Sequence, residues 1–73
     1  MTTRPLYSVV VPVFNEEGNV EALAAGITSA MDKLAVTFEL LFVDDGSKDK
    51  TPALLRKIAH ADPRVRVVRF TRN

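Results

Sequence analysis

Continuous apolar stretches and helix-like spacings alternate along the chain. Residues 7–13 (YSVVVPV) are dense in β-branched side chains and too continuous for a half-exposed strand. They predict a buried strand of a parallel sheet, with Pro12 near its carboxyl end, where a ladder bond can be dropped. Residues 37–43 (TFELLFV) predict a second buried strand, and residues 65–70 (VRVVRF) a third.

The segments between these strands have helical periodicity. One face of the first predicted helix carries Val20, Leu23, Ala24, Ile27, Ala30, Met31 and Leu34. Either Asn15 or Asn19 is a suitable cap for it. The second helix opens at Asp49, or at Thr51 with Pro52 at the first helical position, and ends at Asp62-Pro63. Its apolar face is Leu54, Leu55, Ile58 and Ala59.

This order predicts an α/β fold, a βαβαβ three-stranded parallel sheet flanked by helices. Right-handed crossovers make it half of a Rossmann-like nucleotide-binding sheet, in spatial order 3-2-1. Residues 1–73 then form one incomplete domain. The loops at residues 15–19 (NEEGN) and 44–49 (DDGSKD) follow neighbouring strands and should meet at the rim where such sheets bind ligands.

Two adjacent acids, Asp44 and Asp45, end the second strand. Successive strand residues point to opposite faces, so one acid should face the ligand while the other braces the turn. Gly46 permits a sharp bend and Ser47 can bond local amides. A rim carboxylate accepts hydrogen bonds from a base or from ribose hydroxyls. It is equally consistent with the spacing that both acids only cap the following turn and helix.

The first loop is also ambiguous. Glu16 and Glu17 are more often simple first-turn acids on a helix dipole, and Phe14 would suit either the core or a base. The glycines fit neither a dinucleotide fingerprint nor a P-loop. The diphosphate of a bound nucleotide would therefore have to be neutralised by another group, most simply a divalent cation held by residues outside this chain.

The amino-acid composition excludes further classes of function. Ten basic and nine acidic residues give a net charge of +1, which argues against a nucleic-acid partner. There is no cysteine and His60 is the only histidine, so thiolate and multi-histidine metal sites are excluded. No apolar segment is long enough for a secretory signal or a membrane helix. We expect Arg64, Arg66, Arg69 and Arg72 to be solvated or to blunt a sheet edge, with contact to a phosphate as the less favoured alternative.

Three segments in order carry a family resemblance: VVVPVFNEEGNV, FELLFVDDGSKDKT and DPRVRVVRFTRN. Over residues 7–73 the chain resembles the start of a family 2 inverting glycosyltransferase. It is most similar to the polyprenyl-phosphate sugar transferases, such as dolichol-phosphate mannose synthases and undecaprenyl-phosphate glucosyl- or aminoarabinosyl-transferases. The closing R-x-x-R-N pattern at residues 69–73 favours that subgroup.

The resemblance implies the N-terminal half of a GT-A domain and assigns roles to particular residues. Pro12, Phe14 and Asp45 would line the base and ribose pocket, and Val43 would form part of its wall. Glu16 would reach the nucleotide. Asp44 would be the supporting acid. Phe14 stands where tyrosine is common in the family, so the ring face is kept and one hydroxyl contact is lost.

The resemblance also implies a membrane-associated parent at the cytoplasmic face, with a nucleotide-diphosphate-sugar and a polyprenyl phosphate as partners. The family's Asp-x-Asp, which holds Mg²⁺ or Mn²⁺, is absent from this chain, as are catalytic residues. We expect the 73-residue chain alone to transfer no sugar. We also expect the outer edge of the first strand to be open and to invite self-association.

The residues are also consistent with two other classes of protein. A receiver-like α/β module with an acidic rim would ignore the base of a uridine or guanosine diphosphate. In a structural segment without a ligand, replacing Asp45 with alanine would change no binding measurement.

Overall fold

The computed structural model describes residues 6–70, which form five elements. In chain order they are β1 (Leu6–Val13), α1 (Val20–Lys33), β2 (Thr37–Asp44), α2 (Thr51–Ala61) and β3 (Val65–Arg69). The predicted βαβαβ order is confirmed. The last strand stops one residue earlier than expected. Arg72 and Asn73, part of the closing sequence pattern, lie outside the described residues.

The three strands form one parallel sheet in the order β1-β2-β3, which is the predicted neighbour relation. In this register Val13 lies opposite Asp44, and Asp44 lies opposite Arg69. The carboxyl ends of all three strands are therefore level. Any residue that follows them emerges at the same rim.

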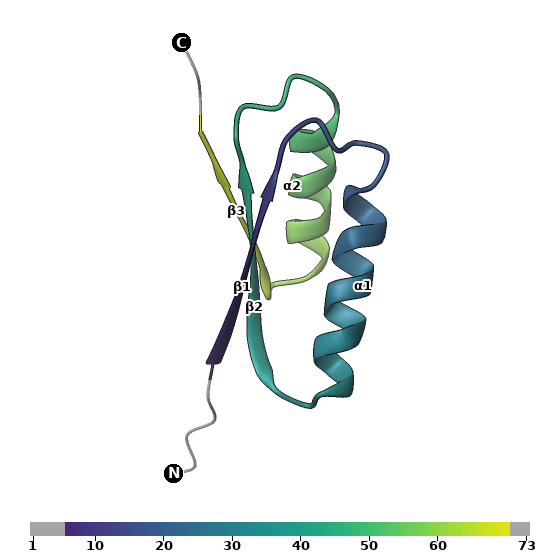
Figure 1. The fold of residues 1–73 in the computed structure, drawn as a ribbon, viewed down its shortest axis with the longest axis vertical. Coiled ribbons are helices and arrows are strands. Elements are labelled where there is room, and N and C mark those ends of the chain that lie inside the picture. The colour runs from purple at the N-terminus through teal and green to yellow at the C-terminus, as the bar shows by residue number, and fades with distance from the viewer. Residues whose placement is uncertain (1–5, 71–73) are drawn as a thin grey trace.

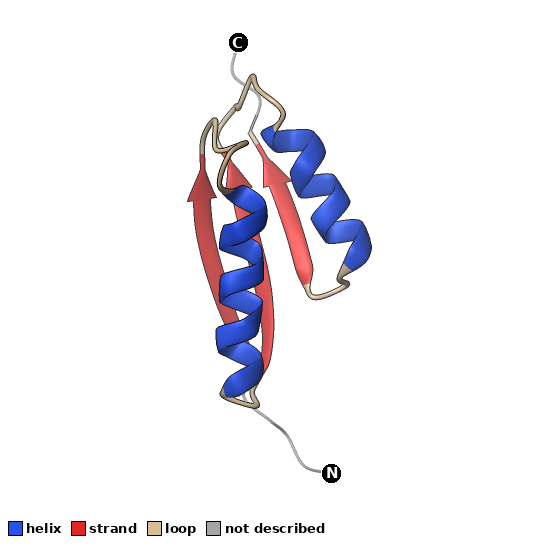
Figure 2. Ribbon diagram, turned by 90° about the vertical axis from the view of Figure 1, so that its right-hand side faces the viewer, coloured by secondary structure: helices blue, strands red, loops and turns tan. Residues whose placement is uncertain are grey.

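Both helices cover the same face of the sheet (Figures 1 and 2). Each crossover is right-handed and both step in one direction along the sheet, which puts their helices on one side. β2 runs through the centre of the core, where Leu40 and Phe42 are fully buried. The core also contains Val13, Val20, Ala24, Phe38, Leu55 and Val65.

The expectation that β1 is buried was wrong. It is an edge strand, and its second face has no helix over it among the described residues. Leu6, Tyr7 and Val10 are each about half or more exposed. Sequence periodicity shows that both faces of β1 are apolar, but it does not show what covers each of them.

The helices begin close to where the sequence placed them. α1 starts after Asn19, whose side chain donates to Glu16 Oε2 (3.2 Å) instead of capping the helix backbone. α2 starts at Thr51, with Pro52 in its first turn, and its end at Ala61 before Asp62-Pro63 is as predicted. Within residues 6–70, neither helix has the length and apolar character needed to span a membrane.

At the end of the sheet opposite the rim, Arg64 connects α1 to the turn between α2 and β3. Its guanidinium donates to Asp32 (2.7 Å) near the end of α1 and to Asp62 (3.0 Å) after α2. It also lies over the ring of Phe38, 4.6 Å from the centroid. The expectation of a merely solvated residue was wrong for Arg64. Hydrogen bonds from Arg64 lower the pKa of the Asp62 carboxyl from its ordinary value of 3.8.

This pKa shift predicts a pH-dependent contribution to stability. A carboxyl with a lowered folded-state pKa stabilises the fold above its ordinary pKa, and the contribution is lost as the pH falls through the folded value. Asp62→Asn should therefore lower the free energy of unfolding near neutral pH by up to about 1 kcal/mol. In urea denaturation the difference from wild type should shrink as the pH falls below 3.8. A gap of constant size across that range would contradict the assignment.

The open face and edge of β1 lead to a second prediction. Val10, Val68 and Phe70 are exposed apolar residues of the sheet and its exit, and β1 has a strand neighbour on one side only in the described sheet. We expect the chain to self-associate as its concentration rises, as measured by sedimentation velocity. Val10→Lys should weaken the association because charge blunts a strand edge. A concentration-independent monomer would contradict this expectation.

Candidate functional site

Two loops lie side by side at the rim (Figure 1): the first loop, residues 14–19, and the second loop, residues 45–50. Side chains of the second loop and of Thr51 accept hydrogen bonds from backbone N–H groups of the first loop, and one bond runs the other way. The pairs are Asn15 N with Ser47 Oγ (2.8 Å), Glu16 N with Thr51 Oγ1 (2.8 Å), Glu17 N with Asp49 Oδ2 (3.3 Å) and Lys48 N with Asn15 Oδ1 (2.9 Å). The predicted meeting of the loops is confirmed.

The accepting hydroxyls are buried. Ser47 and Thr51 are 1% and 0% exposed, so the N–H groups that they accept have little access to water. Asp49 supports Thr51 by accepting its backbone N–H at 2.8 Å. Burial acts to raise the pKa of the Asp49 carboxyl, but hydrogen bonds from the Thr51 hydroxyl and from the N–H groups of Thr51 and Glu17 outweigh it. The pKa of Asp49 is lowered as a result, and its charge is stabilised.

Two residues bend the backbone into this arrangement. Gly46 has φ 82° and Asn15 has φ 50°, both in the left-handed region. Glycine adopts this conformation without steric penalty, and asparagine tolerates it better than most other residues. The turn chemistry read from Asp44-Asp45-Gly46-Ser47 is therefore present in the structure.

Asp44 is fully buried on the helix side of the sheet. Its Oδ1 accepts the N–H of Ser47 (2.9 Å), which closes the turn. Its Oδ2 has no hydrogen-bond partner within residues 6–70, and Arg69 Nε lies 3.6 Å away. Asp44 thus braces the turn from below.

Asp45 occupies the next position and is half-buried. Its N–H donates to Val13 O (3.1 Å), so strand-like pairing continues one residue past β2. Because side chains alternate along a strand, the Asp45 carboxylate is directed to the opposite side from Asp44. Asp44 therefore belongs to the turn, whereas Asp45 lies at the rim on the other side of the strand.

The remaining candidate residues lie on or beside the same rim. Pro12 and Val43 are direct neighbours in the β1–β2 register, on the face without helices. Phe14 is 54% exposed, so it is not a core residue. Glu16 is partly buried, and its carboxylate accepts from Asn19.

Arg69 was missed by the sequence reasoning, which left it in solvent. Its Nη2 donates to Ser47 O (3.2 Å) and its Nε faces Asp44. Once the strand register is known, Asp44 and Arg69 are partners. The spacing of the arginines alone did not reveal this pairing.

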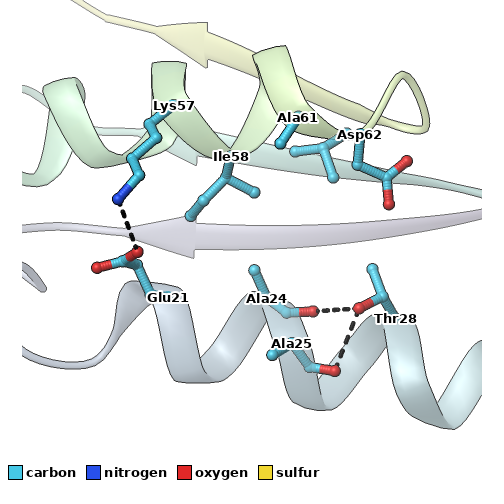
Figure 3. Close-up of a pocket in the computed structure, with 9 residues that line it drawn as sticks. Glu21, Ala24, Ala25, Thr28, Lys57, Ile58, Ala61 and Asp62 are labelled. Atoms are coloured by element: carbon cyan, nitrogen blue, oxygen red, sulfur yellow. Dashed lines mark hydrogen bonds and ion pairs between the residues drawn. The ribbon is translucent and has the colours of Figure 1, made fainter.

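A hollow of about 270 Å³ lies elsewhere, between α1 and α2 (Figure 3). Its polar groups already bond to one another or to backbone. Glu21 pairs with Lys57 (3.7 Å), and the Thr28 hydroxyl donates to Ala24 O and Ala25 O. The rest of its lining is mainly small or aliphatic, and none of the candidate residues borders it. The rim is therefore the better candidate site.

The described residues do not offer a metal centre. Within residues 6–70, no three His, Asp or Glu side chains are close enough to hold an ion. Asp44 and Asp45 are adjacent in sequence but lie on opposite sides of the backbone, so they do not converge on one point.

Comparison with known proteins gives a consistent family. Residues 8–73 match the sequence profile of Glycosyl transferase family 2. The chain is 45% identical over 67 residues to an uncharacterized glycosyltransferase of Bacillus subtilis, covering 92% of this chain and 21% of the relative.

Two further relatives have more specific names. An undecaprenyl-phosphate 4-deoxy-4-formamido-L-arabinose transferase of Aeromonas hydrophila is 44% identical over 54 residues, covering 74% of this chain and 17% of the relative. A bactoprenol glucosyl transferase of Shigella phage SfV is 38% identical over 66 residues, covering 90% and 22%. The chain thus spans about a fifth of the length of these relatives.

The loop contacts predict a stability effect at Thr51. Thr51→Val keeps the shape of the side chain and removes the acceptor of Glu16 N–H. A buried donor without a partner costs roughly 1–3 kcal/mol. Thr37→Val is the matched control because Thr37 is exposed, and it should change stability by less than about 0.5 kcal/mol. Urea denaturation measures both; equal effects would refute a special role for the Thr51 hydroxyl.

Proposed function

The chain belongs to glycosyl transferase family 2, and from this premise we propose that it supplies nucleoside recognition to a polyprenyl-phosphate sugar transferase. The parent would move a sugar from a nucleotide-diphosphate-sugar to a polyprenyl-phosphate lipid with inversion, at the cytoplasmic face of a membrane. The names of the Aeromonas and phage relatives support the lipid-linked class.

The proposal is supported by the different environments of Asp44 and Asp45. Asp44 is fully buried, and its carboxylate accepts a hydrogen bond from the N–H of Ser47 within the turn. Asp45 is half-buried at the carboxyl end of the central strand. In open α/β sheets, ligands bind outside this end of the strands. A carboxylate held there is an acceptor for a base N–H or for ribose hydroxyls.

The neighbouring residues supply the rest of a nucleoside site. The exposed ring of Phe14 offers a flat apolar face to a base. Pro12 and Val43, which are neighbours in the β1–β2 register, would add an apolar surface to the site. Glu16 lies in the first loop, where the bond from its N–H to Thr51 fixes its backbone. In this proposal the residues bind and orient the donor, and none of them performs chemistry.

A divalent cation, Mg²⁺ or Mn²⁺, would neutralise the diphosphate in the parent. The described residues do not fit such an ion, since Asp44 is buried beside Arg69 and no three His, Asp or Glu side chains within residues 6–70 are placed to hold one. Its ligands would therefore come from another part of the parent. What this chain contributes is placement of the nucleoside.

The proposal predicts the binding behaviour of an Asp45 variant. Asp45→Asn should weaken binding of uridine diphosphate or guanosine diphosphate, whichever base the site accepts. The loss of a charged acceptor corresponds to roughly 10- to 100-fold in the dissociation constant. Isothermal titration calorimetry with both nucleotides measures this change. Inorganic pyrophosphate, which has no base, should bind more weakly than the preferred nucleotide.

Glu21→Gln is the matched control because it removes one exposed carboxylate from α1 without touching the rim. It should leave the affinity within about twofold. If Asp45→Asn also binds like wild type, the chain has no nucleoside site at Asp45. If pyrophosphate binds as well as the nucleotides, a receiver-like acidic rim becomes the better description.

A further inference from the structure

We propose that Arg69 is a positioning residue that holds the turn carrying Asp45. This inference rests on the proposed function. It concerns a residue that would act through the turn, since Arg69 reaches Asp44 and Ser47 on the helix side while Asp45 is directed to the other side.

Arg69 makes two contacts that flank Asp45 in the chain. Its Nη2 donates to the carbonyl oxygen of Ser47 at 3.2 Å. Its Nε lies 3.6 Å from Asp44 Oδ2. Asp45 and Gly46 lie between these two anchor points, so the guanidinium spans the whole turn.

The positive charge of Arg69 compensates the buried carboxylate of Asp44. Asp44 is 0% exposed, and its Oδ2 has no hydrogen bond among the described residues. A buried carboxylate is unfavourable unless a cation or donors compensate it. Arg69 is the cation that the structure places beside it. The planar fork of arginine reaches an oxygen of each residue at once, which a lysine ammonium matches less well.

The flexibility of Gly46 explains why Asp45 needs this support. Gly46 holds φ 82°, and glycine has more conformational freedom than any other residue. Asp45 N is fixed by Val13 O and Ser47 N by Asp44 Oδ1. The carbonyl of Ser47 is fixed by Arg69. The Ser47 hydroxyl and Lys48 N–H are bonded to Asn15, but without Arg69 the Ser47 carbonyl loses its partner and the turn gains freedom at Gly46, next to Asp45.

The third strand delivers Arg69 to this position. Phe70 N donates to Asp44 O (2.9 Å), which extends the β2–β3 pairing to the rim. In the register Arg69 is the partner of Asp44. β3 thereby stabilises the rim, although none of its residues was predicted to line the nucleoside pocket.

The experiment compares Arg69→Gln, Arg69→Lys and Arg66→Gln in the chain. Arg66→Gln is the matched control, because it removes the same charge from the same strand at an exposed position of opposite strand parity. Titration calorimetry with uridine and guanosine diphosphate gives affinity. Amide hydrogen exchange by NMR at Asn15 and Ser47 gives the rigidity of the turn independently of any ligand.

We expect Arg69→Gln to weaken nucleotide binding roughly tenfold, the loss equivalent to one hydrogen bond, and to speed exchange at Ser47. Arg69→Lys should recover part of both, and Arg66→Gln should change neither. Wild-type exchange rates in Arg69→Gln would overturn the inference, as would equal weakening by Arg66→Gln. If the wild-type chain binds no nucleotide, the proposed function fails, and the exchange data alone decide whether Arg69 holds the turn.

Discussion

The structure of the rim depends on hydrogen bonds from backbone N–H groups of the first loop to side-chain acceptors in and beside the second loop. Asn15 and Glu16 direct their N–H groups to the hydroxyls of Ser47 and Thr51, which belong to a segment more than thirty residues away. Buried backbone donors are costly to leave unpaired. This requirement aligns the two loops, and the side chains of both loops take their places from it. The geometry of the candidate site is thus set by the pairing of buried backbone N–H groups as much as by the chemistry of its side chains.

The ends of the sheet are held by different chemistry. At the rim, neutral hydroxyls and carboxylates close a network of short bonds. At the opposite end, Arg64 joins α1 to the α2–β3 turn through two ion pairs that are partly exposed. Exposed pairs contribute little to stability, whereas buried bonds define geometry. The stronger constraints therefore lie where the proposed ligand would bind.

Local patterns in the sequence were sufficient for the elements and their order. The periodicity of α1, the apolar β2 segment and the Asp62-Pro63 stop are short-range signals, and the structure agrees with them. Residue spacing alone could not predict which elements pack on each face of β1, or which residues pair with Arg64 and Arg69. These contacts join distant parts of the chain, and they depend on the strand register and on which face of the sheet the helices cover. The division between Asp44 and Asp45 was predictable as an alternation, but the burial of Asp44 beneath Arg69 was not.

Asn15 shows how narrow the choice of residue becomes at such a junction. Its backbone needs the left-handed conformation at φ 50°, and its side-chain oxygen must reach the N–H of Lys48. Glycine would meet the first need and fail the second, while serine or glutamine would strain the backbone. Aspartate would meet both but bring another negative charge to a corner that already holds Asp44, Asp45 and Asp49. A redesign of this loop would therefore have to replace the junction as a whole, because almost no single substitution leaves it intact.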